Sequence, residues 1–164
     1  MSATLFNAVK DGDYETVKKI INDEGIDVNS TKLTEEMMFG DDSDEIEGFD
    51  ETMIEFTLLM IACTFGRYEI CKFLIEKGAD VNRHIVRYAN TEDECVYTTA
   101  LHQAIDNTFA FFTDSKFEVC KLLIQKGADI NAKDGNGQTP LKSASYLDNA
   151  SDLRILLLEN GSTV

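Results

Sequence analysis

An acidic run at residues 41–47, Asp-Asp-Ser-Asp-Glu-Ile-Glu, is the densest group of side chains in this chain that could do chemistry. Carboxylate oxygens are the ligands that Ca²⁺ prefers in proteins. A calcium loop of the EF-hand kind needs alternating acids, then a glycine and a distal glutamate, and Ile46 breaks that register. We therefore expect a solvated acidic loop and assign no metal ligand. A metal- or small-molecule-responsive binding module stays open as an alternative.

Thiols and imidazoles, which could bind zinc or act in catalysis, are few and scattered: Cys63, Cys71, Cys95, Cys120, His84 and His102. They form no CxxC pair and no Cys/His cluster, so the sequence predicts no zinc site. No partner nucleophile is in view for either histidine, and the sequence has no phosphate-binding glycine motif and no nucleophile elbow. We therefore expect no catalytic residue, no cofactor and no enzyme activity.

The cysteines are expected to be free thiols, buried or half-buried, in a reducing compartment. Cys71 and Cys120 occupy the same place in two copies of a repeated phrase. Equivalent residues of neighbouring helical units lie about 8–10 Å apart, which is too far for a disulfide. The first ten residues do not resemble a signal peptide, and no run of about 18 apolar residues occurs. These features predict a cytoplasmic protein without a membrane span.

Charge restricts the partners that the chain can have. Its 164 residues carry 30 acids against 15 Lys and Arg, which gives a net charge of −15. Nucleic acid and anionic membrane both require a basic surface, so neither is expected as a partner. The balance permits another protein with a basic surface, and a gain in solubility alone explains it equally well. We expect a monomer.

A phrase of fourteen residues occurs twice, at residues 69–82 and, 49 residues later, at 118–131. It begins with apolar residues at i, i+3 and i+4, typical of an amphipathic helix, and then reads Lys-Gly-Ala-Asp-(Val/Ile)-Asn. The glycine suits a left-handed C-terminal cap. The same helix pattern recurs at 15–25 and 152–161. An internal repeat predicts a stack of one supersecondary unit, and such stacks usually form binding surfaces.

A shorter helix is expected before each of these four helices, beginning at a threonine that can cap it. These threonines are Thr4, Thr57, Thr99 and Thr139. Thr139 is followed by Pro140, the only proline in the chain, which suits the first position of a helix. The unit is therefore a short helix, a turn, a longer helix and a glycine.

This unit resembles the ankyrin repeat, whose pattern is Thr-Pro-Leu-His-x-Ala-Ala, a glycine, a second helix and Gly-Ala-Asp-Val-Asn. The third repeat keeps Thr99, Leu101, His102 and Ala104, and ends with Gly-Ala-Asp-Ile-Asn at 127–131. The resemblance implies that His102 bonds neighbouring backbone and orders the loops. It implies an all-α ankyrin-repeat solenoid with long finger loops, a single domain over 1–164 whose helix-turn-helix repeats lie at about 3–29, 57–82, 99–131 and 134–164.

Three insertions depart from the ankyrin unit of about 33 residues. An acidic insertion at 30–56 holds ten acids and one lysine, so it carries −9 of the net charge of −15. A long connector occupies 83–98. Seven further residues at 108–114 continue the apolar stripe of the preceding short helix, which predicts one extended helix rather than a loop. The members of that stripe are Leu101, Ile105, Phe109 and Phe112.

The resemblance also implies where a partner would bind, because ankyrin proteins generally use the finger turns and the ends of the first helices, on the concave side. Carried over position by position, and with Phe111 added because it lies off its stripe, the candidates are Thr64, Phe65, Asp106, Asn107, Phe111, Lys133, Asn136, Gln138, Tyr146 and Leu147. Phe65, Tyr146 and Leu147 are expected to be exposed apolar anchors. Packing of Phe65 and Tyr146 against the connectors is the alternative.

The function implied is a protein–protein interaction module that binds its partner through the concave face and the finger loops. A small inhibitor or regulator of a partner enzyme is an alternative. The acidic insertion either steers a basic partner or packs back on the stack through its apolar residues.

Arg154 stands where the other second helices have Val17, Cys71 and Cys120, so the fourth repeat is expected to end the stack. Ile155 replaces a lysine, which leaves a longer natural chain open.

Overall fold

The computed structural model describes residues 3–30, 56–88, 95–106 and 113–163. Its helices come in pairs. The first members are α1 (Ala3–Asp11), α4 (Leu58–Thr64), α6 (Ala100–Ile105) and α8 (Pro140–Ala144). The second members are α2 (Tyr14–Glu24), α5 (Tyr68–Glu76), α7 (Asp114–Gln125) and α9 (Ser151–Glu159). The predicted solenoid of helix pairs is confirmed.

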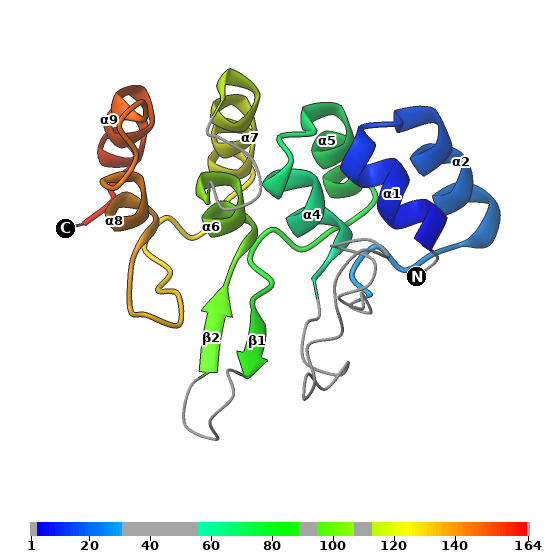
Figure 1. The fold of residues 1–164 in the computed structure, drawn as a ribbon, viewed down its shortest axis with the longest axis horizontal. Helices are drawn as coiled ribbons and strands as arrows, with labels where there is room; N and C mark the ends of the chain where they lie inside the picture. The colour runs from blue at the N-terminus through cyan, green and yellow to red at the C-terminus, as the bar shows by residue number, and fades with distance from the viewer. Residues whose placement is uncertain (1–2, 31–55, 89–94, 107–112, 164) are drawn as a thin grey trace, which may run out of the picture.

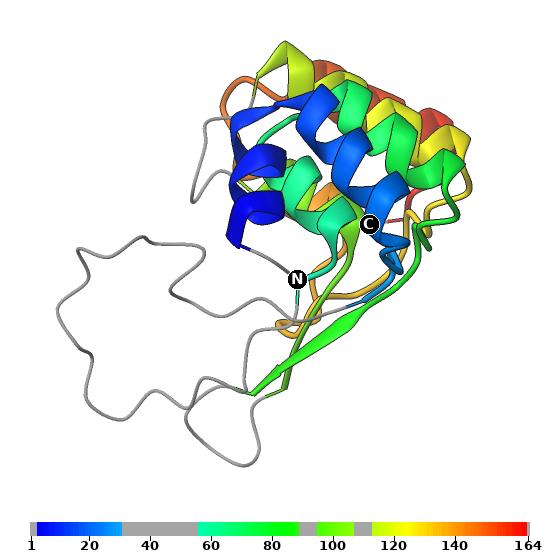
Figure 2. The same ribbon diagram turned by 90° about the vertical axis from the view of Figure 1, so that its right-hand side faces the viewer.

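The helix pairs stack side by side in chain order, as Figure 1 shows. α1, α4, α6 and α8 form one layer because each packs against the next, and α2, α5, α7 and α9 form a second layer in the same way. Figure 2, which looks along the stack, shows the two layers next to each other. The core lies between them, and leucines from both layers are almost fully removed from solvent: Leu5, Leu59, Leu74, Leu101 and Leu123. Burying one such side chain stabilises a fold by about 1.5–3 kcal/mol.

The ends of the short helices follow from the sequence. Thr57, Thr99 and Thr139 precede α4, α6 and α8, and the side chain of each accepts a hydrogen bond from the backbone N–H three residues on. This bond satisfies one of the N–H groups that a helix leaves open at its start. Pro140 occupies the first turn of α8, as predicted. Gly66, with a φ of 64°, makes the tight turn from α4 into α5.

An asparagine at the end of each repeated phrase ties one repeat to the next. Its side-chain nitrogen donates to the carbonyl of the glycine that follows the next second helix, and its side-chain oxygen accepts from the backbone N–H two residues beyond that glycine. The donor–acceptor distances are between 2.7 and 3.3 Å. The bridges run from Asn29 to Gly78 and Asp80, from Asn82 to Gly127 and Asp129, and from Asn131 to Gly161 and Thr163.

The connector 83–98 contains a β-hairpin, which the sequence analysis did not predict. Strands β1 (Ile85–Tyr88) and β2 (Cys95–Thr98) pair antiparallel, with Ile85 opposite Thr98 and Tyr88 opposite Cys95. Figures 1 and 2 show that this finger leaves the helical layers and extends away from them. Its second strand runs into Thr99, the N-cap of α6, so the finger is joined directly to the stack.

The prediction of an extended helix through 112 is wrong. Helix α6 ends at Ile105, and Asp106 has a ψ of 133°, which is incompatible with helix. The carbonyl oxygen of Asp106 accepts a hydrogen bond from Nζ of the buried Lys116 side chain. In a longer helix, that carbonyl would instead accept from a backbone N–H of the next turn. Helix α7 then begins at Asp114 with Thr113 as its cap. Phe109, Phe111 and Phe112 lie outside the described residues.

Cys63, Cys71 and Cys120 are free and buried, as expected of thiols in the core. Cys63 Sγ lies 3.8 Å from Cys71 Sγ, a hydrogen-bonding distance for sulfur. Burial raises the pKa of the Cys63 thiol well above its usual value and that of Cys120 to about 12. Both groups therefore stay protonated near neutral pH, and a protonated thiol is a poor nucleophile and metal ligand.

Candidate partner-binding surface

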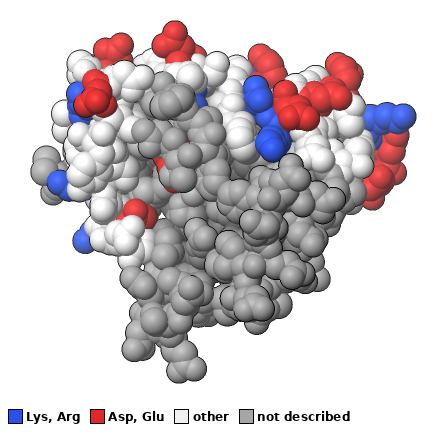
Figure 3. All heavy atoms as spheres, in the orientation of Figure 1, with Lys and Arg blue, Asp and Glu red and all other residues white. Residues whose placement is uncertain are grey.

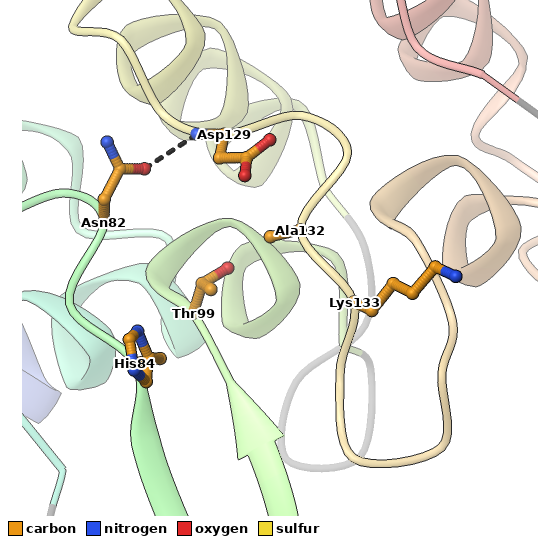
Figure 4. Close-up of a pocket in the computed structure, with 6 residues that line it drawn as sticks. All are labelled: Asn82, His84, Thr99, Asp129, Ala132 and Lys133. Atoms are coloured by element: carbon orange, nitrogen blue, oxygen red, sulfur yellow. Dashed lines mark hydrogen bonds between the residues drawn. The ribbon is translucent and has the colours of Figure 1, made fainter.

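A groove lies between the base of the hairpin and the next finger, residues 133–138 (Figure 4). Its volume is about 490 Å³. We call it the interfinger groove and define it by the side chains that line it: Asn82, His84, Thr99, Asp129, Ala132 and Lys133. These residues come from three segments: the entry to β1, the start of α6, and the turn after α7.

The wall of the interfinger groove is held by hydrogen bonds between repeats. Asn82 Oδ1 accepts from the backbone N–H of Asp129 at 2.7 Å, the bond drawn in Figure 4. Asn82 Nδ2 donates to the carbonyl of Gly127 at 2.9 Å. The Asp129 carboxylate accepts from the N–H of Asn131 at 2.9 Å, which fixes the turn that carries Asp129. The groove is therefore largely formed before any partner arrives, which reduces the ordering cost of binding.

The finger at 133–138 is also held in place. Asp134 Oδ1 accepts from the backbone N–H groups of Asn136 and Gln138, at 2.9 and 2.8 Å. The backbone N–H of Asp134 donates to the carbonyl of Gln138 at 2.9 Å. This short finger therefore has a fixed shape, and it presents the exposed side chains of Lys133 and Asn136.

His102 connects this finger to α6, as the sequence resemblance implied. Its Nε2 lies 3.1 Å from the carbonyl oxygen of Gln138, so Nε2 carries a proton and donates. Its Nδ1 lies 2.9 Å from Thr99 Oγ1 and accepts from that hydroxyl in the neutral ring. Burial lowers the pKa of His102 below its usual 6.5, more than the Gln138 carbonyl and the carboxylates of Asp134 and Asp129 raise it. The neutral ring is thus a structural link rather than a catalytic base.

The chemistry of the interfinger groove is that of polar recognition. It offers one carboxylate, at Asp129, one ammonium group, at Lys133, and the imidazole of His84. Among the residues that the structure describes, no group of three or more His, Cys, Asp or Glu side chains could hold a metal ion. The acidic run 41–47, considered above for calcium, lies outside those residues.

The structure divides the predicted site residues into three sets. Lys133, Asn136 and Tyr146 are exposed, with Tyr146 at 64%. Phe65, Asp106 and Gln138 are half-buried, and the Phe65 ring packs against the core. Thr64 and Leu147 are buried, at 5% and 7% exposure. Asn107 and Phe111 lie outside the described residues.

Two of these placements differ from the sequence analysis. Leu147 was expected to be exposed, but the chain turns after α8 with the Leu147 N–H bonded to Ala144, and the side chain joins the core. Thr64 lies in the contact between α4 and α6, where its hydroxyl is 3.0 Å from both the Met60 carbonyl and Gln103 Oε1. Neither side chain is available to a partner in this structure.

Sequence reasoning missed most of the interfinger groove. Asn82 lies in the first copy of the repeated phrase and Asp129 in the second. The near-identical sequence of the two copies was the signal that could have placed these residues next to each other. His84, to which the sequence analysis assigned no role, is exposed and lines the groove. The position of His84 depends on the hairpin, and no hairpin was predicted.

A stack of helix pairs with ordered fingers defines a class of protein, the helical-repeat modules that bind other proteins. The chain belongs to the ankyrin repeat family: the family model described as ankyrin repeats (3 copies) matches residues 4–134 and 84–164. Domains of this family are generally binding modules without catalytic activity. Among the described helices, none is long and apolar enough to cross a membrane.

A similar stretch occurs in a protein of Saccharomyces uvarum described as probable palmitoyltransferase AKR2, which is 32% identical over 80 residues. The match covers 49% of this chain but 8% of that protein. Because the shared part is so small a fraction of the larger protein, the activity in its name is not carried over to this chain.

Proposed function

We propose that this chain binds another protein through the interfinger groove and the adjoining side of the first helices, with the exposed ring of Tyr146 as a further contact. The observation that carries the proposal is the groove itself. Three segments converge there, and the asparagine bridge between Asn82 and Asp129 holds two of them in register. A site of this kind suits an extended loop or peptide of a folded partner, because it offers donors and acceptors on more than one side.

We further propose that the partner presents a basic surface. The support is the charge of the insertion 30–56, whose ten acids and one lysine are a property of the sequence alone. Long-range attraction of this kind raises the association rate and weakens with salt. Binding by a chain that lacks 33–52 should therefore be slower and less salt-sensitive than binding by the full chain.

We propose that the repeats act as one domain and as a monomer, in a reducing compartment that keeps Cys63, Cys71 and Cys120 as thiols. Inhibition of a partner enzyme is a narrower form of the same function. It is tested by assaying the activity of a captured enzyme with increasing amounts of this chain.

The test of the groove uses two exposed side chains. The partner is first recovered with the wild-type protein and is then titrated with His84→Ala and Lys133→Ala, which both change exposed lining residues, and with Lys72→Ala on the exposed face of α5 as the control. We expect each finger variant to weaken binding about 3–30-fold, the range of ordinary interface side chains, and the control to bind like wild type. Equal affinities for all four proteins would place the binding surface elsewhere.

A further inference from the structure

A second groove lies at the end of the stack formed by α8 and α9, with a volume of about 570 Å³. We call it the terminal groove. Leu141 and Leu158 provide its apolar surface, and Lys133, Lys142 and Arg154 line it with positive charge. Figure 1 shows α8 and α9 at one end of the stack, and Figure 3 shows both Lys and Arg atoms (blue) and Asp and Glu atoms (red) at the same end. Lys133 lines both this groove and the interfinger groove.

The terminal groove differs in chemistry from the surfaces that hold the repeats together. In the second repeat, three side chains of the helix pair are fully buried: Met60, Cys63 and Cys71. The equivalent positions of the fourth repeat are Lys142, Ser145 and Arg154. Lys142 and Arg154 thus put positive charge where the second repeat has apolar or thiol side chains. Burying a charged side chain without a partner costs several kcal/mol, so this surface suits a polar contact better than an apolar one.

The positive charges of the terminal groove lack carboxylate partners among the described residues. The Lys142 ammonium lies 5.2 Å from the centre of the Tyr146 ring, and Lys133 makes no ion pair with a residue that the structure describes. Arg154 Nη1 donates to the carbonyls of Ala144 and Leu147, at 3.1 and 2.9 Å, and Arg154 likewise has no ion pair within the described part of the chain. Those bonds hold the guanidinium in place and leave its charge unneutralised.

The nearest acid to Lys133 along the finger is Asp134. Its carboxylate already accepts from the backbone N–H groups of Asn136 and Gln138. The terminal groove is thus a positively charged site on a chain whose net charge is −15.

We propose that the terminal groove binds an acidic peptide segment of a partner protein, one that carries an apolar side chain between its carboxylates. The carboxylates would pair with Lys133, Lys142 and Arg154, and the apolar side chain would cover Leu141 and Leu158, of which Leu158 is 51% exposed. Arg and Lys are suited to carboxylates, and Arg binds them with fixed geometry. This partner is opposite in charge to the one proposed for the acidic insertion, so the two sites would bind different ligands.

The test uses a fluorescent synthetic peptide of alternating Glu and Leu, with a Gln/Leu peptide and a Lys/Leu peptide as controls. The net charge of the chain repels an acidic peptide, so non-specific attraction cannot produce the expected result. We expect the Glu/Leu peptide to bind more tightly than both controls. We expect Lys142→Glu and Leu158→Ser to weaken that binding about 3–10-fold each, while Lys72→Glu, an identical charge change on α5, leaves it unchanged.

Three results would overturn the proposal. They are tighter binding of the Lys/Leu peptide than of the Glu/Leu peptide, equal affinities of Lys142→Glu and Lys72→Glu, and a concentration-dependent dimer by light scattering that Lys142→Glu abolishes. The last would assign the groove to a second copy of the chain. Amide chemical shifts of Leu141 and Leu158 that move with the Glu/Leu peptide, while those of Asn82 and His84 do not, would separate this site from the interfinger groove.

Discussion

Three basic side chains bond backbone carbonyls where the first helices end. Arg67 donates to the carbonyl of Lys10 at the end of α1, Lys116 to that of Asp106 after α6, and Arg154 to those of Ala144 and Leu147 around the end of α8. The last carbonyls of a helix have no partner within it, and a positive charge is favourable there. The sequence analysis assigned no such role to these residues, because nothing in their spacing reveals the carbonyl that each one bonds.

The lowered pKa of His102 predicts how the stability of the fold depends on pH. Its folded pKa lies below 6.5, so the unfolded chain takes up the proton first and stability falls as pH drops through about 6.5. The stability that the neutral His102 ring contributes is fully lost below the pKa of His102 in the folded protein. Urea unfolding between about pH 5.5 and 7.5 should show that the stability advantage of wild type over His102→Gln shrinks toward the acid end. His84→Gln, which removes the other histidine, is the matched control. A pH-independent difference for His102→Gln would contradict the assignment.

A comparison of Gly66 with Gly25 separates the cost of backbone strain from the cost of a steric conflict. Their φ angles, 64° and 60°, are nearly the same and left-handed. A methyl group at Gly66 would lie 3.2 Å from Lys116 Cγ and 3.4 Å from the Lys116 backbone nitrogen, whereas Gly25 has open space. We expect Gly25→Ala to cost about 1–2 kcal/mol and Gly66→Ala about 1–3 kcal/mol more, since it adds a steric conflict. Equal losses in chemical denaturation would show that the Lys116 side chain moves aside freely.

At the scale of elements, the sequence predicted the helices better than the fingers. The threonine caps at Thr57, Thr99 and Thr139, with Pro140, placed the last three helix pairs, because these signals are local. The first pair was also predicted, but Thr4 does not cap it: α1 begins at Ala3, so Thr4 lies inside the helix. The extension of α6 failed because the apolar spacing of 101–112 fits a helix, whereas the bond from Lys116 to Asp106 is a tertiary contact. The hairpin had a local signal that was overlooked: Ile-Val-Arg-Tyr and Cys-Val-Tyr-Thr are rich in β-branched and aromatic residues.

The asparagine bridges predict a loss of coupling between repeats. Asn82→Ala removes the bonds to the Gly127 carbonyl and the Asp129 N–H, both in the next repeat. We expect a loss of about 1–2 kcal/mol in unfolding free energy, because two partly exposed hydrogen bonds are removed. Amide hydrogen exchange should become faster around Asp129. The control is Asn136→Ala, which changes an exposed finger asparagine outside this bridge; a loss as large as that of Asn82→Ala would contradict the account.

At the scale of the whole molecule, repetition positions the binding surface. Each helix pair contacts mainly its neighbours, so the fingers stand in a row that the stack orders. The interfinger groove forms where two fingers of unequal length meet, one a hairpin and one a short turn. Apart from Asn82 and Asp129, which the repeated phrase could have paired, its residues could not be grouped from the sequence, because the alignment of the two fingers depends on the stack. The family explains the scaffold, and the interfinger groove lies at the base of the inserted hairpin.

Site-directed photo-crosslinking tests the central claim, that the partner lies in the interfinger groove, most directly. A benzophenone side chain is placed at His84, which lines the groove, and at Lys72 and Lys121 on the exposed faces of α5 and α7 as controls. We predict a crosslink to the partner from His84 and none from either control, because of these three residues only His84 lines the groove. Crosslinks from Lys72 or Lys121 without one from His84 would contradict the account and place the partner on the outer helices.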